Sequence, residues 1–423
     1  MLEIIALILF ILMYILMIVF SEKREYVALL CALIYILIGV LPVSSIIGSI
    51  DFNVLLMMGG TMIIVYYFIE SKMPVLIADF LLDKSPNVMW VTIFMSAFAG
   101  FISAFIDNTA TVLMIAPVAL AVCKKLEINP VPMILALAVS SNLQGAATLV
   151  GDTTSIMLGA HAKMDFNQFF ILNGKLSIFF AVELGALASL FVMFFMFKKE
   201  TREVEASKDV RVKDYFPAIM LIVLVIALIA ASFIPNKPDI TNGLICMITA
   251  LFVMFVDAGK HKTTNRILED LKTIDYQTLL LLSGLFMVIA GITNVGVIED
   301  FSKLIVRIGG DNIFLLYTII VVGSAIFSGF IDNIPYVATM LPVVGGVSAT
   351  LGISPYLLYF GLLSGATLGG NLTPIGASAN IAAVGLLKKE GYKVSFKDFM
   401  KIGVPLTVSA LTAGYLFIWF VWK

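Results

Sequence analysis

Long apolar runs alternate with short polar segments along the whole chain. Because a transmembrane helix needs about 20 consecutive apolar residues, this pattern predicts a series of membrane-spanning helices. We expect them near residues 2–20, 26–49, 52–69, 176–198, 216–234, 239–257, 276–293 and 403–421. Three shorter amphipathic stretches, at 73–83, 164–170 and 298–308, are better suited to lie in the membrane interface. The predicted fold class is an all-α polytopic membrane protein.

Four further apolar runs are interrupted by polar residues. The runs 88–123 and 313–350 are broken only around Asp107-Asn108-Thr109 and Asp332-Asn333. Each is either two minimal crossings or one re-entrant hairpin, and we favour the hairpin because a loop at the membrane surface would normally carry more charge. The runs 130–158 and 355–384 are interrupted by glycine and hydroxyl residues, which predicts broken helices.

The interrupted stretch occurs twice in the sequence. Shifted by 225 residues without a gap, Ser103–Ile156 aligns with Ser328–Ile381, and 18 of the 54 positions are identical. The polar and turn-forming matches exclude a coincidence of apolar composition; they are Asp107/Asp332, Asn108/Asn333, Pro117/Pro342, Pro130/Pro355, Gly145/Gly370, Thr148/Thr373 and Gly151/Gly376. We therefore expect two repeats, residues 1–198 and 216–423, joined by a polar cytoplasmic linker at 199–215.

Composition and charge agree with a membrane protein and orient it. The chain has 61% hydrophobic and 13% charged residues and a mean hydropathy of +1.05, whereas soluble domains carry about 25% charge. With five crossings per repeat, the loops on one side hold 21 of the 27 Lys and Arg residues. The positive-inside rule places these loops in the cytoplasm of a plasma-membrane protein and both termini outside. An odd number of crossings also makes the second repeat inverted relative to the first, as in many secondary transporters.

The polar residues at the interruptions are the candidate site. They are Asp107, Asn108, Thr109, Asn142, Gly145, Thr148, Asp152, Asp332, Asn333, Gly370, Asn371, Thr373, Ser378 and Asn380. Irregular backbone at membrane depth must be buried in protein or line a wet cavity. The aspartates favour a transport role over simple helix capping, because a neutral Asn or Ser could cap as well.

Other polar residues have weaker claims. Asp152 has Ala377 as its repeat mate, and capping alone could explain it. Glu183 is either a proton site or a buried hydrogen-bonding group, while His161 and His261 are expected in solvated loops. Cys31, Cys123 and Cys246 stand singly in apolar runs and are expected to be buried, without a metal or disulfide role.

Four segments carry a resemblance to a known superfamily: FIDNTATVLMIAPV, SNLQGAATLVGDTTSIMLG, GFIDNIPYVATMLPV and GATLGGNLTPIGASANIAAVG. The sequence resembles the ArsB/NhaD branch of the ion transporter superfamily, and within it the P-protein-like permeases have the most similar sequences in these segments. The resemblance implies an elevator-type transporter, in which hairpins and broken helices slide against the scaffold of a homodimer. It also implies that Asn108 and Asn333 contact ion and substrate, and that Thr148 and Thr373 face the substrate.

The same resemblance implies two cation sites, with Na⁺ near Asp107, Asn108 and Gly145 and near Asp332, Asn333 and Gly370. Related sodium-coupled dicarboxylate carriers have Ser-Asn-Thr at both hairpin tips. Here the tips read Asp107-Asn108-Thr109 and Asp332-Asn333-Ile334. The tips and breaks supply acids, and no Lys or Arg falls inside a predicted span near them. A carboxylate substrate would therefore meet like charge unless cations or backbone N–H groups offset it.

These observations predict a cation-coupled (H⁺ or Na⁺) secondary transporter of a small inorganic solute, such as arsenite or another oxyanion. A Na⁺/H⁺ antiporter is the alternative, and a sodium-coupled di- or tricarboxylate symporter, citrate-like, comes third. An enzyme is disfavoured because neither histidine has the neighbours of an HExxH metal motif. We expect no cofactor and no nucleic-acid partner; ATP-driven pumping would need a separate ATPase subunit, because the chain has no GxxxxGK[ST] motif.

Overall fold

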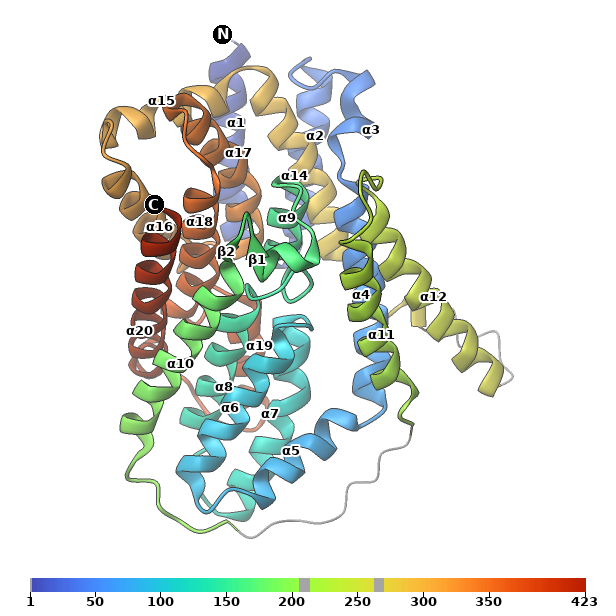
Figure 1. Cartoon of the computed structure of the whole chain (residues 1–423), viewed down its shortest axis with the longest axis vertical. Helices are drawn as coiled ribbons and strands as arrows, with labels where there is room; N and C mark the ends of the chain where they lie inside the picture. The colour runs from blue at the N-terminus through green and yellow to red at the C-terminus, as the bar shows by residue number, and fades with distance from the viewer. Residues whose placement is uncertain (1, 205–213, 262–269) are drawn as a thin grey trace.

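The computed structural model describes residues 2–204, 214–261 and 270–423, and these are almost entirely helical (Figure 1). The first half contains α1 (Leu2–Val19), α2 (Arg24–Leu37), α3 (Ile46–Ser49), α4 (Phe52–Glu70), α5 (Met73–Asp83), α6 (Val88–Ser103), α7 (Asn108–Lys125), α8 (Val131–Gln144), α9 (Thr153–His161) and α10 (Ile178–Phe197). The second half contains α11 (Phe216–Ala231), α12 (Thr241–His261), α14 (Tyr276–Asn294), α15 (Val297–Gly309), α16 (Ile313–Ser328), α17 (Asn333–Leu351), α18 (Tyr356–Gly369), α19 (Ser378–Lys389) and α20 (Phe396–Trp422).

Several of these helices are suited to cross a membrane. In the described ranges, eight are long and apolar enough on their own: α1, α4, α7, α10, α12, α14, α17 and α20. A further pair, α15 and α16, is bent by 118° at a short break. The protein is therefore a mostly helical, polytopic integral membrane protein, as the sequence predicts.

Two local features differ from the sequence-based expectation. The predicted span 26–49 ends early, because α2 stops at Leu37, Gly39 adopts a left-handed φ of +80°, and Pro42 is extended. Near the predicted interfacial stretch 164–170 lies a small antiparallel hairpin, β1 (Ile171–Leu172) with β2 (Lys175–Leu176). The first feature shortens a predicted span, whereas the hairpin fills the short interval before α10.

The helices pack in corresponding pairs in the two halves. α4 packs along α12 and α14 along α2, while α6 packs with α8 and α16 with α18. The first two contacts depend on repeat-related glycines: a Cβ at Gly60 would lie 2.5 Å from the carbonyl carbon of Cys246, and one at Gly284 would lie 2.9 Å from that of Ala28. Small residues allow such close helix contacts in membranes. These contacts align Ala28 of α2 with Cys246 of α12.

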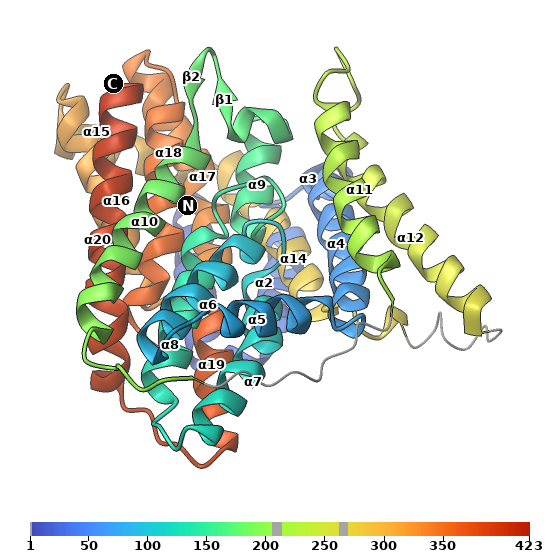
Figure 2. The same ribbon diagram turned by 60° about the horizontal axis from the view of Figure 1, so that its bottom comes forward.

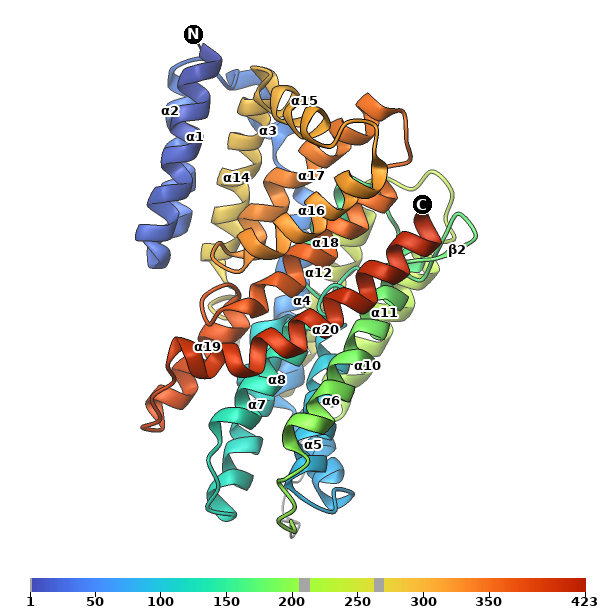
Figure 3. The same cartoon turned by 90° about the vertical axis from the view of Figure 1, so that its left-hand side faces the viewer.

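The outer helices frame this arrangement. α10 packs along α20, which runs diagonally across one side of the molecule (Figure 3). α11 and α12 stand at the opposite edge, beside α4 (Figure 2). The three cysteines are buried and free, as expected.

The polar linker predicted at 199–215 lies partly outside the described residues, because 205–213 are not described. At its end, the Asp214 carboxylate accepts a hydrogen bond from Lys260 Nζ near the end of α12, which holds the pKa of that carboxyl below its usual value. His261 ends α12, and its side chain lies outside the part of the chain that the structure describes.

Candidate functional site

A cavity of about 440 Å³ lies between the two halves of the protein. Its lining includes the two predicted hairpin tips, Asp107–Ala110 and Asp332–Ile334, and the starts of α9 and α19 at Gly151–Thr153 and Ala377–Ala379. Side chains of α4 and residues around the start of α14 close the remaining wall. Segments more than 200 residues apart in the sequence thus share one space.

Four of the helices that begin at this cavity follow the interruptions of the apolar runs, and three of these four are capped by an aspartate. The Asp107 carboxylate accepts hydrogen bonds from the backbone N–H groups of Thr109 and Ala110, both at 3.0 Å, at the start of α7. Asp332 accepts from the N–H of Ile334 at 3.1 Å at the start of α17, and Asp152 caps α9. Capping therefore does occur, as the simpler interpretation requires, yet all three carboxylates also line the cavity.

The fourth helix, α19, begins without a side-chain cap because its N-cap residue is Ala377. Its first residues, Ser378 and Ala379, line the cavity. Backbone N–H groups at a helix N-terminus favour negative charge. The cavity therefore combines carboxylates, which suit a cation, with one helix start that has N–H groups not taken by an aspartate.

Asparagine side chains connect the broken helices behind the cavity. Asn142 on α8 donates to the Thr367 carbonyl at 2.9 Å and to Asn371 Oδ1 at 3.0 Å, and Asn371 donates to the Val139 carbonyl at 3.1 Å. Asn108 donates to Asn142 Oδ1 at 3.0 Å, which ties the first tip to this network. The network places the ends of α8 and α18 against each other at the centre of the protein.

The same bonds recur between tip and break in each half. The hydroxyl of Thr148 donates to the Ala104 carbonyl, and that of Thr373 donates to the Gly329 carbonyl. Ser155 Oγ donates to the Gly145 carbonyl at 3.2 Å, and Asn380 Nδ2 donates to the Gly370 carbonyl at 3.1 Å. Among the predicted site residues, Gly145, Thr148, Gly370, Asn371, Thr373 and Asn380 stand behind the cavity and are not part of its lining.

Carbonyl groups gather around one glycine in each half. A Cβ at Gly151 would lie 2.6 Å from the Gly145 oxygen, 2.7 Å from the Ala104 oxygen and 2.9 Å from the Ser103 oxygen. Gly376 is surrounded in the same way by the oxygens of Gly370, Gly329 and Ser328. In the described ranges, no group of three or more His, Cys, Asp and Glu side chains could hold a metal ion. Carbonyl oxygens are ligands that suit Na⁺, so each half gathers groups able to contact a cation at this glycine.

Arg24 is the residue that sequence reasoning missed. Its guanidinium Nη1 lies 2.6 Å from Asp332 Oδ2, and the two side chains are 27% and 12% exposed. Arg24 begins α2, although it falls within the loop predicted at 21–25, and its partner lies 308 positions away. No spacing in the sequence connects the two.

Sequence reasoning also did not predict several residues that line the cavity. Asp275, Thr278 and Tyr66 line the cavity from α4 and the start of α14. Asp275 matches Asp51 in the duplication, a signal that places it at a helix start but does not show that it faces the cavity. Glu183 is half-buried on α10 and outside the cavity lining. His161 is exposed, as expected, but it ends α9 and its Nε2 lies 3.2 Å from the Tyr359 hydroxyl.

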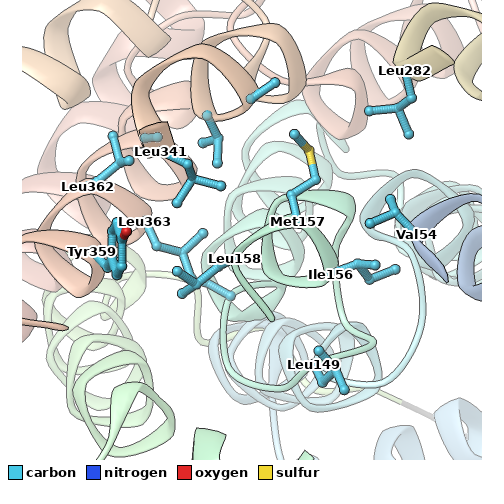
Figure 4. Close-up of a cluster of buried hydrophobic side chains, with 14 of the residues drawn as sticks. Val54, Leu149, Ile156, Met157, Leu158, Leu282, Leu341, Tyr359, Leu362 and Leu363 are labelled. Carbon is cyan, nitrogen blue, oxygen red and sulfur yellow. The ribbon is translucent and has the colours of Figure 1, made fainter. Parts of the chain in front are cut away.

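An apolar cluster closes the cavity along α9. Ile156, Met157 and Leu158 are buried against α4 and α17, in a cluster that also contains Val54 and Leu341 (Figure 4). Ile156 itself lines the cavity. α9 therefore has the cavity at its start and a buried apolar core along its length.

Comparisons with known proteins agree with a transporter. A family model described as "CitMHS: Citrate transporter" matches residues 7–362 and 303–423. The chain is 32% identical over 434 residues to the uncharacterized transporter Mb2703 of Mycobacterium bovis, covering 99% of this chain and 98% of that protein. It is 27% identical to the human P protein, covering 89% of this chain but 54% of the P protein.

Two solved structures share the fold at low sequence identity. The YdaH transporter of Alcanivorax borkumensis has a TM-score of 0.61 at 13% identity and covers 88% of this chain and 86% of its own. MtrF of Neisseria gonorrhoeae, from a class of antimetabolite efflux pumps, has a TM-score of 0.57 at 13% identity. The match covers 91% of this chain and 83% of the MtrF chain. The predicted superfamily is confirmed: the family model and the mycobacterial relative each span most of the chain, so the protein belongs to the CitMHS citrate transporter family.

Proposed function

We propose that the protein is a cation-coupled secondary transporter, driven by H⁺ or Na⁺, that moves a small inorganic solute such as arsenite or another oxyanion. The observation that carries the proposal is the shared cavity. Both Asp-Asn tips and both broken-helix starts, one set from each half, line a single space of about 440 Å³. Charged residues at membrane depth are costly and mark ion or substrate pathways.

In this proposal the cation and the solute use different groups. We assign H⁺ or Na⁺ to the aspartates at the tips and the amides of Asn108 and Asn333, which line the cavity, and to the carbonyls near Gly145 and Gly370, which stand behind it. The uncapped start of α19 offers N–H groups to an oxyanion. Arsenous acid is neutral near pH 7 and would not be repelled by the carboxylates.

The proposed cycle is an elevator movement of the hairpins and broken helices within a homodimer. The duplicated sequence and the matched bonds of Thr148 and Thr373 support it, because equal halves of opposite orientation give two equivalent end states. We place both termini outside and the linker in the cytoplasm, on the distribution of Lys and Arg.

Citrate is the second candidate, and the family match favours it. A tricarboxylate would meet Asp107, Asp152, Asp275 and Asp332 in the same cavity, so cations would have to enter with it or before it. A Na⁺/H⁺ antiporter would use the same aspartates without another solute.

Flux measurements in proteoliposomes separate these functions. We expect arsenite counterflow that depends on a Na⁺ or pH gradient and is lost in Asp107→Asn, while the exposed-site control Asp239→Asn, 80% exposed, keeps it. Citrate uptake with the same ion dependence would identify a citrate carrier. Na⁺ movement driven by a pH gradient alone, with neither solute required, would overturn the first choice in favour of the antiporter.

A further inference from the structure

The two tips have unequal charge around them, although they have the same Asp-Asn sequence. In the first half, Asp107 stands with a second acid, Asp152, and both line the cavity. In the second half, Ala377 replaces that acid, and Asp332 is paired with Arg24 at 2.6 Å. With ionised side chains, Asp107 and Asp152 carry a charge of about −2, whereas the pair of Asp332 and Arg24 carries a charge of about 0. Asp275, from the second half, is a further acid in the same lining.

The scaffold helices show the same inequality. The close contacts of Gly60 with Cys246 and of Gly284 with Ala28 align α12 with α2. In this alignment, the position of Arg24 is taken in α12 by Asn242. Two hydrogen bonds support this alignment. The Asn53 side chain accepts from the Gly243 N–H at 2.7 Å, and its repeat mate Gln277 donates to Glu25, the residue aligned with Gly243, at 3.3 Å. The position that corresponds to Arg24 in α12 thus holds a neutral amide, whose oxygen accepts from Lys237 Nζ at 3.3 Å.

The tip amides also differ. Asn108 Nδ2 donates a hydrogen bond to Asn142, and Asn108 Oδ1 accepts one from Ser103 Oγ at 2.6 Å. This oxygen lies on the side of the amide that faces the Gly145 backbone. The Asn333 amide fits its surroundings best with the nitrogen turned inward, donating to the Ala366 carbonyl at 3.2 Å and the Gly376 carbonyl at 3.3 Å. An amide oxygen can bind a cation and an amide nitrogen cannot. Towards the glycine of the break, the first tip therefore presents an amide oxygen and the second tip an amide nitrogen.

We propose that Arg24 is a positioning residue that makes the two tips unequal: its ion pair anchors the second tip to α2 and leaves Asp107, beside Asp152, to hold the coupling cation. This inference rests on the proposed cation-coupled function and deepens it. Besides Asp107 itself, the titratable groups facing this space are Asp152 at α9, Asp275 at α14, Asp332 at α17, Tyr66 on α4 and, at its edge, Arg24 on α2.

A charge-balance experiment tests the proposal. The melting temperature of the purified protein is measured in two titrations. In one, NaCl replaces choline chloride at constant ionic strength, and in the other the pH is varied in choline chloride. The cation that stabilises the wild type is then used for all variants. Arg24→Gln leaves an unpaired carboxylate, so half-maximal stabilisation should need about three- to tenfold less cation. Asp332→Asn leaves an unpaired guanidinium and should need more cation by a similar factor.

Three further variants complete the test. The double variant Arg24→Gln/Asp332→Asn restores the net charge and should return the midpoint to within about twofold of the wild type. Arg24→Lys keeps the charge and should stay near the wild type, as should the control Arg307→Gln on the exposed face of α15. Asp107→Asn should abolish the response. General structural damage would not shift two single variants in opposite directions and cancel in the double.

The outcomes separate the inference from the function beneath it. If Asp332→Asn abolishes the cation response as Asp107→Asn does, or if both pair variants move the midpoint in one direction or leave it unchanged, the unequal roles are wrong while cation coupling stands. If Arg24→Gln does not fold, the cation responses of Asp332→Asn and Asp107→Asn are compared, and unequal responses support the unequal roles of the two tips. A wild-type protein stabilised by neither cation, with no ion-dependent flux, would remove the proposed function and this inference with it.

Discussion

At the residue scale, glycines at the breaks are required by backbone contact and not by loop flexibility. Gly151 has three carbonyl oxygens within 2.9 Å of the place where a Cβ would stand, and Gly376 has the same surroundings in the second half. Backbone oxygens cannot turn aside as a flexible side chain could. The repeat keeps glycine at both positions because the break must close onto the hairpin tip.

Gly151→Ala should therefore destabilise the protein by about 1–3 kcal/mol, the usual cost of overpacking. The control is Gly323→Ala on α16, where nothing lies within 4 Å of the added methyl; alanine there should leave stability unchanged or raise it slightly, because it is the better helix former. Melting temperatures in detergent decide the matter. Equal melting temperatures for the two variants would show that the carbonyl cluster does not confine Gly151.

At the element scale, the two broken helices have diverged in packing. α9 is buried against α4 and α17, whereas its counterpart α19 packs on α7 and α8. The repeat-related pair Ile156 and Ile381 shows the difference, since Ile156 is 3% exposed and Ile381 is 48% exposed. The same residue type at equivalent positions thus seals a core in one half and faces outward in the other.

Ile156→Ala should cost about 2–4 kcal/mol, because a buried aliphatic side chain leaves a cavity behind. Ile381→Ala should cost less than about 1 kcal/mol, because little apolar contact is lost. Thermal unfolding of both variants in the same detergent measures the difference. A larger loss from Ile381→Ala than from Ile156→Ala would mean that α19, and not α9, is the sealed element.

At the scale of the whole molecule, the cavity is lined by residues next to the loops expected in the cytoplasm. Thr273 and Asp275 precede α14, and Ile69 lies near the end of α4. These positions adjoin the predicted cytoplasmic loops 70–87 and 258–275. On the proposed orientation, the cavity opens to the inside of the cell.

A cysteine at Thr273 tests this orientation. The three native cysteines are buried, so a membrane-impermeant maleimide should report on the introduced residue. We expect Thr273→Cys to be labelled in inside-out vesicles and protected in intact cells, and Asp239→Cys, in the loop before α12, to show the reverse. Labelling of Thr273→Cys in intact cells would reverse the predicted topology.

Sequence reasoning reached those parts of the site whose polar residues interrupt apolar runs. Asp107, Asp152 and Asp332 were identified because a charge in such a run needs a reason, and all three line the cavity. Arg24 was missed because it falls in a predicted loop, where a basic residue is ordinary, and its partner is set by tertiary packing. Thr148 and Thr373 were expected to face the substrate, but their hydroxyls bond to carbonyls of the tips, a contact that spacing alone does not reveal.

The ion pair of Arg24 and Asp332 also bears on leakage. In the proposed cycle, the second hairpin of an empty carrier would have to leave α2. This movement would separate the Arg24 guanidinium from the Asp332 carboxylate where both are largely buried, and isolated buried charges are unfavourable. Futile movement without cargo would be suppressed by the same contact that holds the hairpin. The driving gradient would then be spent only on productive turnovers.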